Sequence, residues 1–294
     1  MDKKGKLALI EAFLGNSIFG FSFLFSKRAL AIASPDVLLG FRFTVAFLLL
    51  NLLMCTGIVK LHLKNKPIKY LIILGIAQPV FYFICETKGL KLLDTSFVGI
   101  LIAVIPIVAT GLGAVFLKEK VTMVKIIFIV ISIAGVILTT LGKQSGGFNT
   151  KGFLFILGAV FSAAMYDLIS RRSSQDFSTF ERTYVMFAIG CLYFMTSALL
   201  KYRGSYVEYI LVPMKNMQFW ISIVFLSGIS SVGAFLLLNH AISHLKVAEF
   251  AVFSNVTTVI SILAGVFFLH ESFGVLQIIG SIIIILGVYG VNML

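Results

Sequence analysis

Charged side chains are scarce in this sequence. Asp, Glu, Lys and Arg make up 12% of the 294 residues, whereas apolar residues make up 59%, and the mean hydropathy is +1.05. A soluble domain of this length needs much more polar surface to face water. The composition therefore excludes a soluble globular protein and predicts an integral membrane protein.

Cysteine is also rare. The three cysteines, Cys55, Cys85 and Cys191, lie inside apolar runs. Because their number is odd and their surroundings are apolar, the sequence indicates no disulfide framework, and we interpret them as small core residues.

Catalytic signatures are missing as well. The sequence contains no G-x-S-x-G, no H-E-x-x-H and no phosphate-binding glycine loop with its Lys and Ser/Thr. We therefore predict that the protein is not an enzyme and carries no cofactor and no metal. An intramembrane enzyme is kept as an alternative, but such an enzyme needs a nucleophile and a base that are paired at the same depth in the membrane.

The basic residues occur in short clusters between apolar runs, although the formal net charge is +12. Membrane topology places them in this way, whereas a nucleic-acid-binding protein has a basic domain. The predicted partners are the lipid bilayer and a small-molecule solute, with no nucleic acid, and the protein is a monomer or a homodimer. The N-terminal MDKKGK and the long apolar run after it are interpreted as a signal anchor and first span.

The chain divides into ten apolar runs of the length that crosses a bilayer as a helix. Short charged or turn-forming connections separate them and leave no room for an extramembrane domain. In its first half, Lys and Arg are more frequent on the side of the N-terminus, which predicts a cell-membrane protein with both termini in the cytoplasm. The runs are 7–29, 36–57, 68–90, 95–117, 122–142, 149–171, 178–200, 217–241, 247–269 and 273–293.

One stretch of the chain occurs twice. Residues 88–137 align without a gap on residues 240–289 at a constant offset of 152. Each copy contains G-x-x-F-L-x-E, which ends at Glu119 and Glu271, followed sixteen residues later by Gly135 and Gly287. We interpret this pattern as an internal duplication.

The duplication extends upstream, because Ser26-Lys27-Arg28 aligns with Ile169-Ser170-Arg171, and Arg42 aligns with Arg182 after a short gap. The predicted repeats are residues 7–142 and 149–293, with five helices each. An odd number of helices forces the second repeat to enter the membrane upside down. The predicted fold is therefore all-α, with ten transmembrane helices in two inverted five-helix repeats.

These residues resemble the ten-helix branch of the drug/metabolite transporter superfamily, which is built from two EamA-type domains. The first run is similar to that family's W-G-x-x-F-x-x-x-K pattern, with Phe19 in place of Trp, and the second has its Pro and Arg-Phe. The last run matches the ending E-x-x-x-x-x-Q-x-x-G. The matching residues are Gly20, Phe23, Lys27, Pro35, Arg42, Phe43, Pro106, Glu271, Gln277, Gly280 and Gly287.

The first copy departs from this pattern at Lys125 and Phe128, and the second departs at Thr258, where Pro is expected. The resemblance implies a secondary transporter that moves small organic solutes by alternating access, commonly amino acids or related metabolites in the direction of export. A multidrug or cation efflux carrier, a channel and a non-transport intramembrane protein stay as alternatives.

Polar side chains at mid-span mark candidate binding positions, because they must be satisfied internally or face a water-filled cavity. The alternative is that they bond helix to helix, as small polar residues do in membranes. Tyr82 and Tyr166 are additionally predicted to form a stacking platform for the solute. The candidate binding residues are Asn16, Ser17, Gln78, Tyr82, Glu86, Ser162, Tyr166, Ser230, Asn255 and Thr258.

Charged residues inside spans predict two ion pairs, Arg42 with Glu86 and Asp167 with Arg182, because each pair shares a depth. The pairs either close gaps in the structure or act as gates.

Glu119 and Glu271 are predicted to cap the helices that follow them. His240 and His244 have a spacing compatible with a metal site, but interfacial polar residues are the preferred interpretation.

Overall fold

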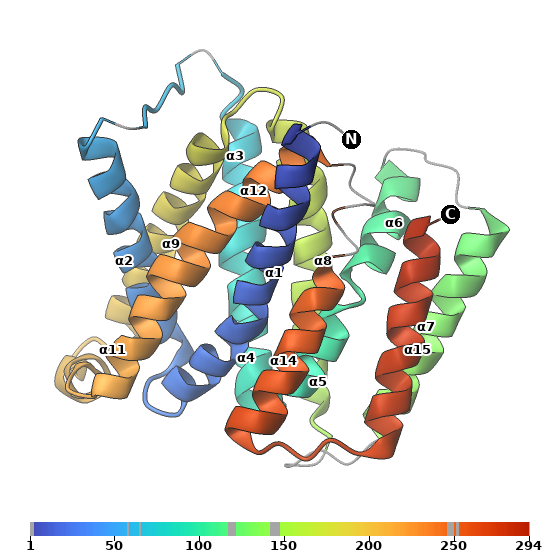
Figure 1. Ribbon diagram of the computed structural model, residues 1–294. Coiled ribbons are helices and arrows are strands. Elements are labelled where there is room, and N and C mark those ends of the chain that lie inside the picture. Colours follow the sequence, from blue (N-terminus) through green and yellow to red (C-terminus); the bar gives the residue numbers. More distant parts are fainter. Residues whose placement is uncertain are drawn as a thin grey trace.

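The computed structural model describes residues 3–57, 59–64, 66–116, 122–141, 148–245, 250 and 253–293, and every regular element in these ranges is a helix (Figure 1). Seven helical stretches are long and apolar enough to cross a membrane, and three shorter apolar helices accompany them. These stretches coincide with the ten apolar runs. In chain order they are α1 (Lys3–Leu30), α2 (Pro35–Cys55), α3 to α4 (Lys69–Leu92), α5 and α6 (Thr95–Ile102 and Ile105–Phe116), α7 (Met123–Leu141), α8 (Thr150–Ser173), α9 (Thr179–Lys201), α11 to α12 (Met217–His244), α14 (Ser254–Leu269) and α15 (Val275–Met293).

Polar residues fix where several helices begin. The Ser34 hydroxyl accepts a hydrogen bond from Val37 N at the start of α2, and Asn149 accepts one from Gly152 N at the start of α8. Asn216 caps α11 in the same way, after the short helices η2 (Val207–Leu211) and α10 (Val212–Met214). A helix beginning has unpaired N–H groups, so these caps make the short connections possible.

Three of the spans depart from a regular α-helix near the middle of their described residues. The third span comprises α3 (Lys69–Gly75), the π-helical segment η1 (Ile76–Phe81) and α4 (Tyr82–Leu92), and Gln78 before Pro79 has an extended backbone. The eighth has a similar π-helical segment, η3 (Phe225–Ala234), between α11 (Met217–Val224) and α12 (Phe235–His244). The fourth is interrupted between α5 and α6. Irregular backbone at membrane depth is tolerated where protein or a cavity surrounds it.

The second half of the chain runs opposite to the first. α1 begins and α15 ends at the same end of the bundle, which we call the N-terminal end (top of Figure 1). α1 runs away from that end, whereas α8, the first helix of the second half, runs toward it. The inverted arrangement predicted from the odd number of helices is therefore confirmed.

Packing between the halves is reciprocal. α1 packs against η3, α12 and α14, while α8 packs against η1, α4, α5 and α6. The second helices, α2 and α9, pack on each other, and so do the fifth helices, α7 and α15. Each first helix thus lies between the third and fourth helices of the other half, so that the centre of the bundle belongs to both.

Glycines allow α7 and α15 to approach closely at the side of the bundle (Figure 1). A Cβ atom on Gly135 would lie 2.8 Å from the carbonyl oxygen of Gly280, and one on Gly287 would lie 2.8 Å from that of Phe128. Gly135 and Gly287 are the glycines that the duplication matches. Their shared role is close contact between membrane helices.

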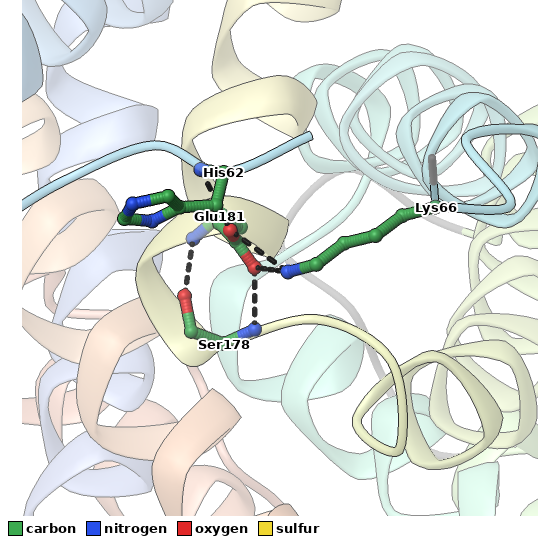
Figure 2. Close-up of polar contacts among 4 residues, drawn as sticks. All are labelled: His62, Lys66, Ser178 and Glu181. Carbon is green, nitrogen blue, oxygen red and sulfur yellow. Dashed lines mark hydrogen bonds and ion pairs between the residues drawn. The ribbon is translucent and has the colours of Figure 1, made fainter. Parts of the chain in front are cut away.

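Glu181 ties the connection between α2 and α3 to the start of α9 at the N-terminal end (Figure 2). Its carboxylate accepts hydrogen bonds from His62 N at 2.9 Å and from Lys66 Nζ at 2.8 Å. It also completes a capping box with Ser178. The long connection is thereby held against the helix end.

The cysteines are free, but they do not all lie in the core. Cys85 is buried, Cys191 is half-buried and Cys55 is exposed. Cys55 ends α2 in an apolar run that faces outward, so the prediction of a core position was wrong for this residue.

Candidate functional site

A cavity lies in the centre of the bundle, where both halves meet. It encloses about 880 Å³ of space between the side chains, counting the solvent at its opening. The first half supplies walls from α1, α2, η1, α4 and the α5–α6 break, and the second half supplies α8, α12 and α14. The lining residues are Asn16, Phe19, Ser22, Phe23, Arg42, Gln78, Tyr82, Phe83, Glu86, Ile102, Ile105, Pro106, Ala163, Tyr166, Asp167, Phe235, Leu238, Ile242, Phe250, Ser254 and Thr257.

Aromatic rings form much of the wall. Phe235 is in edge contact with Phe19, with ring centroids 5.2 Å apart, and with Tyr166 at 6.3 Å. Tyr82 meets Phe83 edge to face at 4.9 Å. Such a wall offers flat apolar surface with polar hydroxyl groups at its edges, which suits an amphiphilic solute.

Arg42 brings a positive charge to the cavity. Its side chain is buried, Nε donates to Ser231 Oγ at 3.0 Å, and Nη2 donates to Ser230 Oγ at 3.2 Å. The guanidinium carbon lies 4.3 Å from the centre of the Phe83 ring. Arg42 therefore joins α2 to η3 of the other half while it faces the cavity.

Two carboxylates share the cavity with Arg42. Glu86 on α4 is buried and accepts a hydrogen bond from the Thr87 hydroxyl at 3.0 Å. Asp167 on α8 is half-buried and has no hydrogen bond or ion pair to another residue in the described part of the chain. The cavity thus contains one cation and two anions.

Five of the candidate binding residues line the cavity: Asn16, Gln78, Tyr82, Glu86 and Tyr166. The two tyrosines that were predicted to form a stacking platform are both among them. Tyr166 is held by a hydrogen bond from its hydroxyl to Asn239 Oδ1 at 2.8 Å.

The other five candidates lie outside the cavity wall. Ser17, Ser162 and Thr258 donate to the carbonyl oxygens of Phe13, Ala77 and Gly99, respectively. Ser230 accepts from Arg42, and Asn255 Oδ1 is buried without a hydrogen-bond partner among the described residues. Three of these hydroxyl groups bond to helix backbone, as the alternative interpretation expected.

The two predicted ion pairs do not form in this structure. Arg42 points to the η3 serines instead of Glu86. Arg182 donates to Ser170 Oγ at 2.7 Å, Asn239 O at 2.7 Å and Ser243 Oγ at 2.6 Å, and not to Asp167. Shared depth does not determine the direction in which a side chain points around its helix, and in each pair the arginine turns to other partners.

Arg42 and Arg182 also differ in their place on the helix. Ser34 and Ser178 cap α2 and α9, and Arg42 comes two turns after its cap whereas Arg182 comes one turn after. Aligned by these caps, the arginines are not equivalent, which corrects their alignment in the duplication. Arg182 accordingly binds helices at the N-terminal end, outside the cavity wall.

Sequence reasoning missed a symmetric pair of basic caps. Lys27, at the end of α1, donates to Leu90 O and Leu93 O at the end of α4, at 2.7 and 2.5 Å. Arg171, near the end of α8, donates to Ile242 O and Ser243 O at the end of α12. A cation at the carbonyl end of a helix is favourable, and the basic residues near the ends of both first helices were the available signal.

Similarity to known proteins identifies the family of this chain. The model of the EamA-like transporter family matches residues 6–141 and 150–293. The chain belongs to the EamA-like transporter family. An uncharacterized transporter of Bacillus subtilis (strain 168), YcxC, is 35% identical over 289 residues, which cover 97% of this chain and 92% of that protein. An uncharacterized transporter of Archaeoglobus fulgidus is 23% identical over 276 residues, which cover 93% and 94% of the two chains.

A solved crystal structure shows the same fold, with a TM-score of 0.64 and 17% identity over 95% of this chain and 96% of its own. Family membership and the helices together show a multi-pass membrane transporter of the drug/metabolite type, with two repeats in its membrane fold.

The structure explains the acidic end of the EamA-type motif. Glu271, after α14, accepts hydrogen bonds from Thr95 N at 2.6 Å, Ser96 N at 2.8 Å and Ser96 Oγ at 2.5 Å. It therefore caps α5 of the other repeat, and the prediction that it caps the following helix was wrong. Gly265 provides the space for this contact, because a Cβ atom there would overlap the Glu271 carboxylate.

Gln277 performs the cap that was predicted for Glu271. Its Oε1 accepts from Gly274 N at 2.7 Å, directly before α15 begins. The other acidic motif residue, Glu119, lies outside the described residues.

We expect Glu271→Gln to destabilise the EamA fold by about 2 to 4 kcal/mol, because an amide turns an NH₂ group toward donors and leaves buried N–H groups of α5 without an acceptor. The measurement is the thermal unfolding temperature of the purified protein. Glu208→Gln is the matched control, since Glu208 is exposed in the connection before α11. Equal unfolding temperatures for the two variants would show that the cap contributes nothing.

His240 forms an interfacial contact. Its Nδ1 lies 2.5 Å from Glu11 Oε2 on α1, and His244 Nδ1 lies 3.0 Å from His240 O. Among the described residues there is no group of three His, Cys, Asp or Glu side chains that could hold a metal ion. A carboxylate that is distant in sequence therefore provides the partner of His240.

Proposed function

We propose that this EamA-type protein is a secondary carrier that exports amino acids or related small metabolites across the cytoplasmic membrane by alternating access. The observation that carries the proposal is the central cavity, whose walls come from both inverted repeats. In such folds the solute occupies the interface between repeats, and the repeats move around it.

The chemistry of the cavity favours a solute with both charged and apolar parts. Arg42 offers a guanidinium, Glu86 and Asp167 offer carboxylates, and the rings of Tyr82 and Tyr166 offer flat surface. An amino acid has a carboxylate, an ammonium group and a side chain that match these three features.

At the end of the bundle opposite the N-terminal end, two contacts between helices lie beside each other. Lys27 ties α1 to the end of α4, and Glu271 ties the α14–α15 connection to the start of α5. Both contacts meet at the connection between α4 and α5. In the proposed mechanism this end opens when these contacts separate.

The test is uptake of a labelled amino-acid panel, with small organic cations beside it, into proteoliposomes that contain the purified protein. A carrier shows saturation and accelerated exchange when unlabelled solute is inside the vesicles. A channel shows no such acceleration, and an enzyme consumes the solute. If the vesicles exchange organic cations but no amino acid, the proposed cargo is wrong and the protein is a cation efflux carrier.

We further propose that both termini face the cytoplasm, because Lys and Arg of the first half gather at the N-terminal end. Tags inserted after Gly57 and after Lys201 lie at opposite ends of the bundle. The tag after Gly57 is expected in the cytoplasm, and a tag that is accessible from outside intact cells would reverse the orientation.

A further inference from the structure

Asp167 is a carboxylate in the cavity wall that has no partner among the described residues. It lies on α8 within the membrane-spanning stretch, and no described residue gives it a hydrogen bond or forms an ion pair with it. A charged side chain in such a place is costly unless a cation or a proton neutralises it. The structure therefore leaves one negative charge in the cavity to be balanced.

The neighbouring arginines are already engaged. All three hydrogen-bonded partners of Arg182 are on α8 and α12, and Arg171 donates to the carbonyl oxygens at the end of α12. Arg172 forms an ion pair with Asp176 at 3.0 Å. None of these side chains is directed to Asp167.

Three other basic groups on the elements that pack against α8 have contacts elsewhere, and Lys91 on α4 is exposed. Lys88 on α4 lies 5.5 Å from the Phe155 ring centre, Lys69 on α3 lies over Tyr70, and His240 on α12 contacts Glu11. Arg42 across the cavity binds the serines of η3. The described residues thus supply no counter-ion for Asp167.

The surroundings of Asp167 select the kind of cation. Tyr166 is adjacent in sequence, and Phe235 lies in edge contact with Tyr166 in the same wall. Rings beside a carboxylate bind an organic ammonium group through both its charge and its alkyl part. A bare metal ion needs several oxygen ligands together, and the described residues contain no such cluster.

We infer that Asp167 binds the ammonium group of the transported solute and so selects organic amines and amino acids over neutral or purely anionic molecules. The inference rests on the proposed function, because it assigns a contact within the proposed binding cavity. Asp167 was expected from its depth to pair with Arg182, and the structure frees it for this role.

The experiment measures how fast dicyclohexylcarbodiimide, an apolar reagent for carboxyl groups, modifies Asp167 in the purified full-length protein, with mass spectrometry of the labelled peptide. The probes are phenethylamine, L-phenylalanine, L-lysine and putrescine, with phenethyl alcohol and 3-phenylpropionate as matched molecules without an ammonium group. We expect at least one ammonium compound to slow the modification of Asp167 severalfold, whereas the two molecules without that group do not.

The inference is overturned if no ammonium compound slows the modification, or if phenethyl alcohol slows it equally. Modification of Glu86 in the same samples is the internal control, and protection of Glu86 alone would also overturn the inference. As a second variant, Asp167→Asn is expected to lose the thermal stabilisation that the protecting amine gives to the native protein. Asp167→Glu, which keeps the charge, is expected to retain part of it.

The two proposals fail separately. Protection of Asp167 in a protein that shows no solute exchange in vesicles supports the cation site and removes the carrier function. Solute exchange by a protein whose Asp167 no amine protects overturns the cation site and leaves the carrier function in place.

Discussion

Gly280→Leu is expected to separate α15 from α7 and to lower the unfolding temperature more than any other substitution considered above. A Cβ on Gly280 would lie 2.5 Å from Thr139 Cγ2 and 2.8 Å from the carbonyl oxygen of Gly135. The second of these neighbours is backbone, which cannot turn aside. Overpacking of a core costs about 1 to 3 kcal/mol, and here the whole helix must move, so we expect the upper part of that range or more.

Thermal unfolding and size-exclusion chromatography of the purified variant measure this effect. Gly111→Leu is the matched control, because Gly111 is also helical, and a Cβ there has no heavy atom within 4 Å. Leucine favours a helix over glycine by roughly 0.5 to 1 kcal/mol, so the control is expected to unfold at the native temperature or slightly above it. A native unfolding temperature for Gly280→Leu would show that the contact between the fifth helices is loose.

Arg42→Gln is expected to reduce solute exchange in proteoliposomes by more than about tenfold, or about 1.4 kcal/mol. The substitution removes the hydrogen bonds to Ser230 and Ser231, which link the two repeats beside the cavity. It also removes the contact with Phe83 of the same repeat. It also leaves Glu86 buried without a neighbouring positive charge, which is costly in a low-dielectric site.

The double variant Arg42→Gln, Glu86→Gln separates these two causes. Because Glu86 no longer carries an unbalanced charge, the double variant is expected to exchange solute faster than Arg42→Gln alone. Arg203→Gln makes the same charge change at an exposed position and is expected to act as the native protein. Additive effects of the two single substitutions would show that Arg42 and Glu86 act independently.

Local sequence signals account for contacts whose partner is near in sequence. Several helix starts followed local signals, such as Ser34 before α2 and the Ser178–Glu181 capping box of α9. Asn16, Tyr82 and Tyr166 reached the cavity because their polar groups lie at mid-span on helices that face the centre. Phe235, Ser22 and Thr257 also line the cavity, yet neither their composition nor their spacing distinguished them from packing residues.

Expectations failed where the partner lies far away in the chain. Glu271 reaches Thr95 and Ser96 on the other repeat, and Arg42 reaches Ser230 and Ser231, instead of the nearer candidates. Depth in the membrane can be estimated from position along a span. The rotation of a helix about its axis cannot be estimated in that way, and it decides which neighbour a side chain meets.

The sequence alone determined the membrane character, the ten helices and the inverted duplication. The length of apolar runs, the turn residues and the odd number of helices in each repeat can all be read along the chain. Only the tertiary structure decided the cavity, the partners of Arg42 and Glu271, and the absence of a partner for Asp167 among the described residues. These features depend on how the two repeats pack against each other, and packing brings together residues that no local pattern connects.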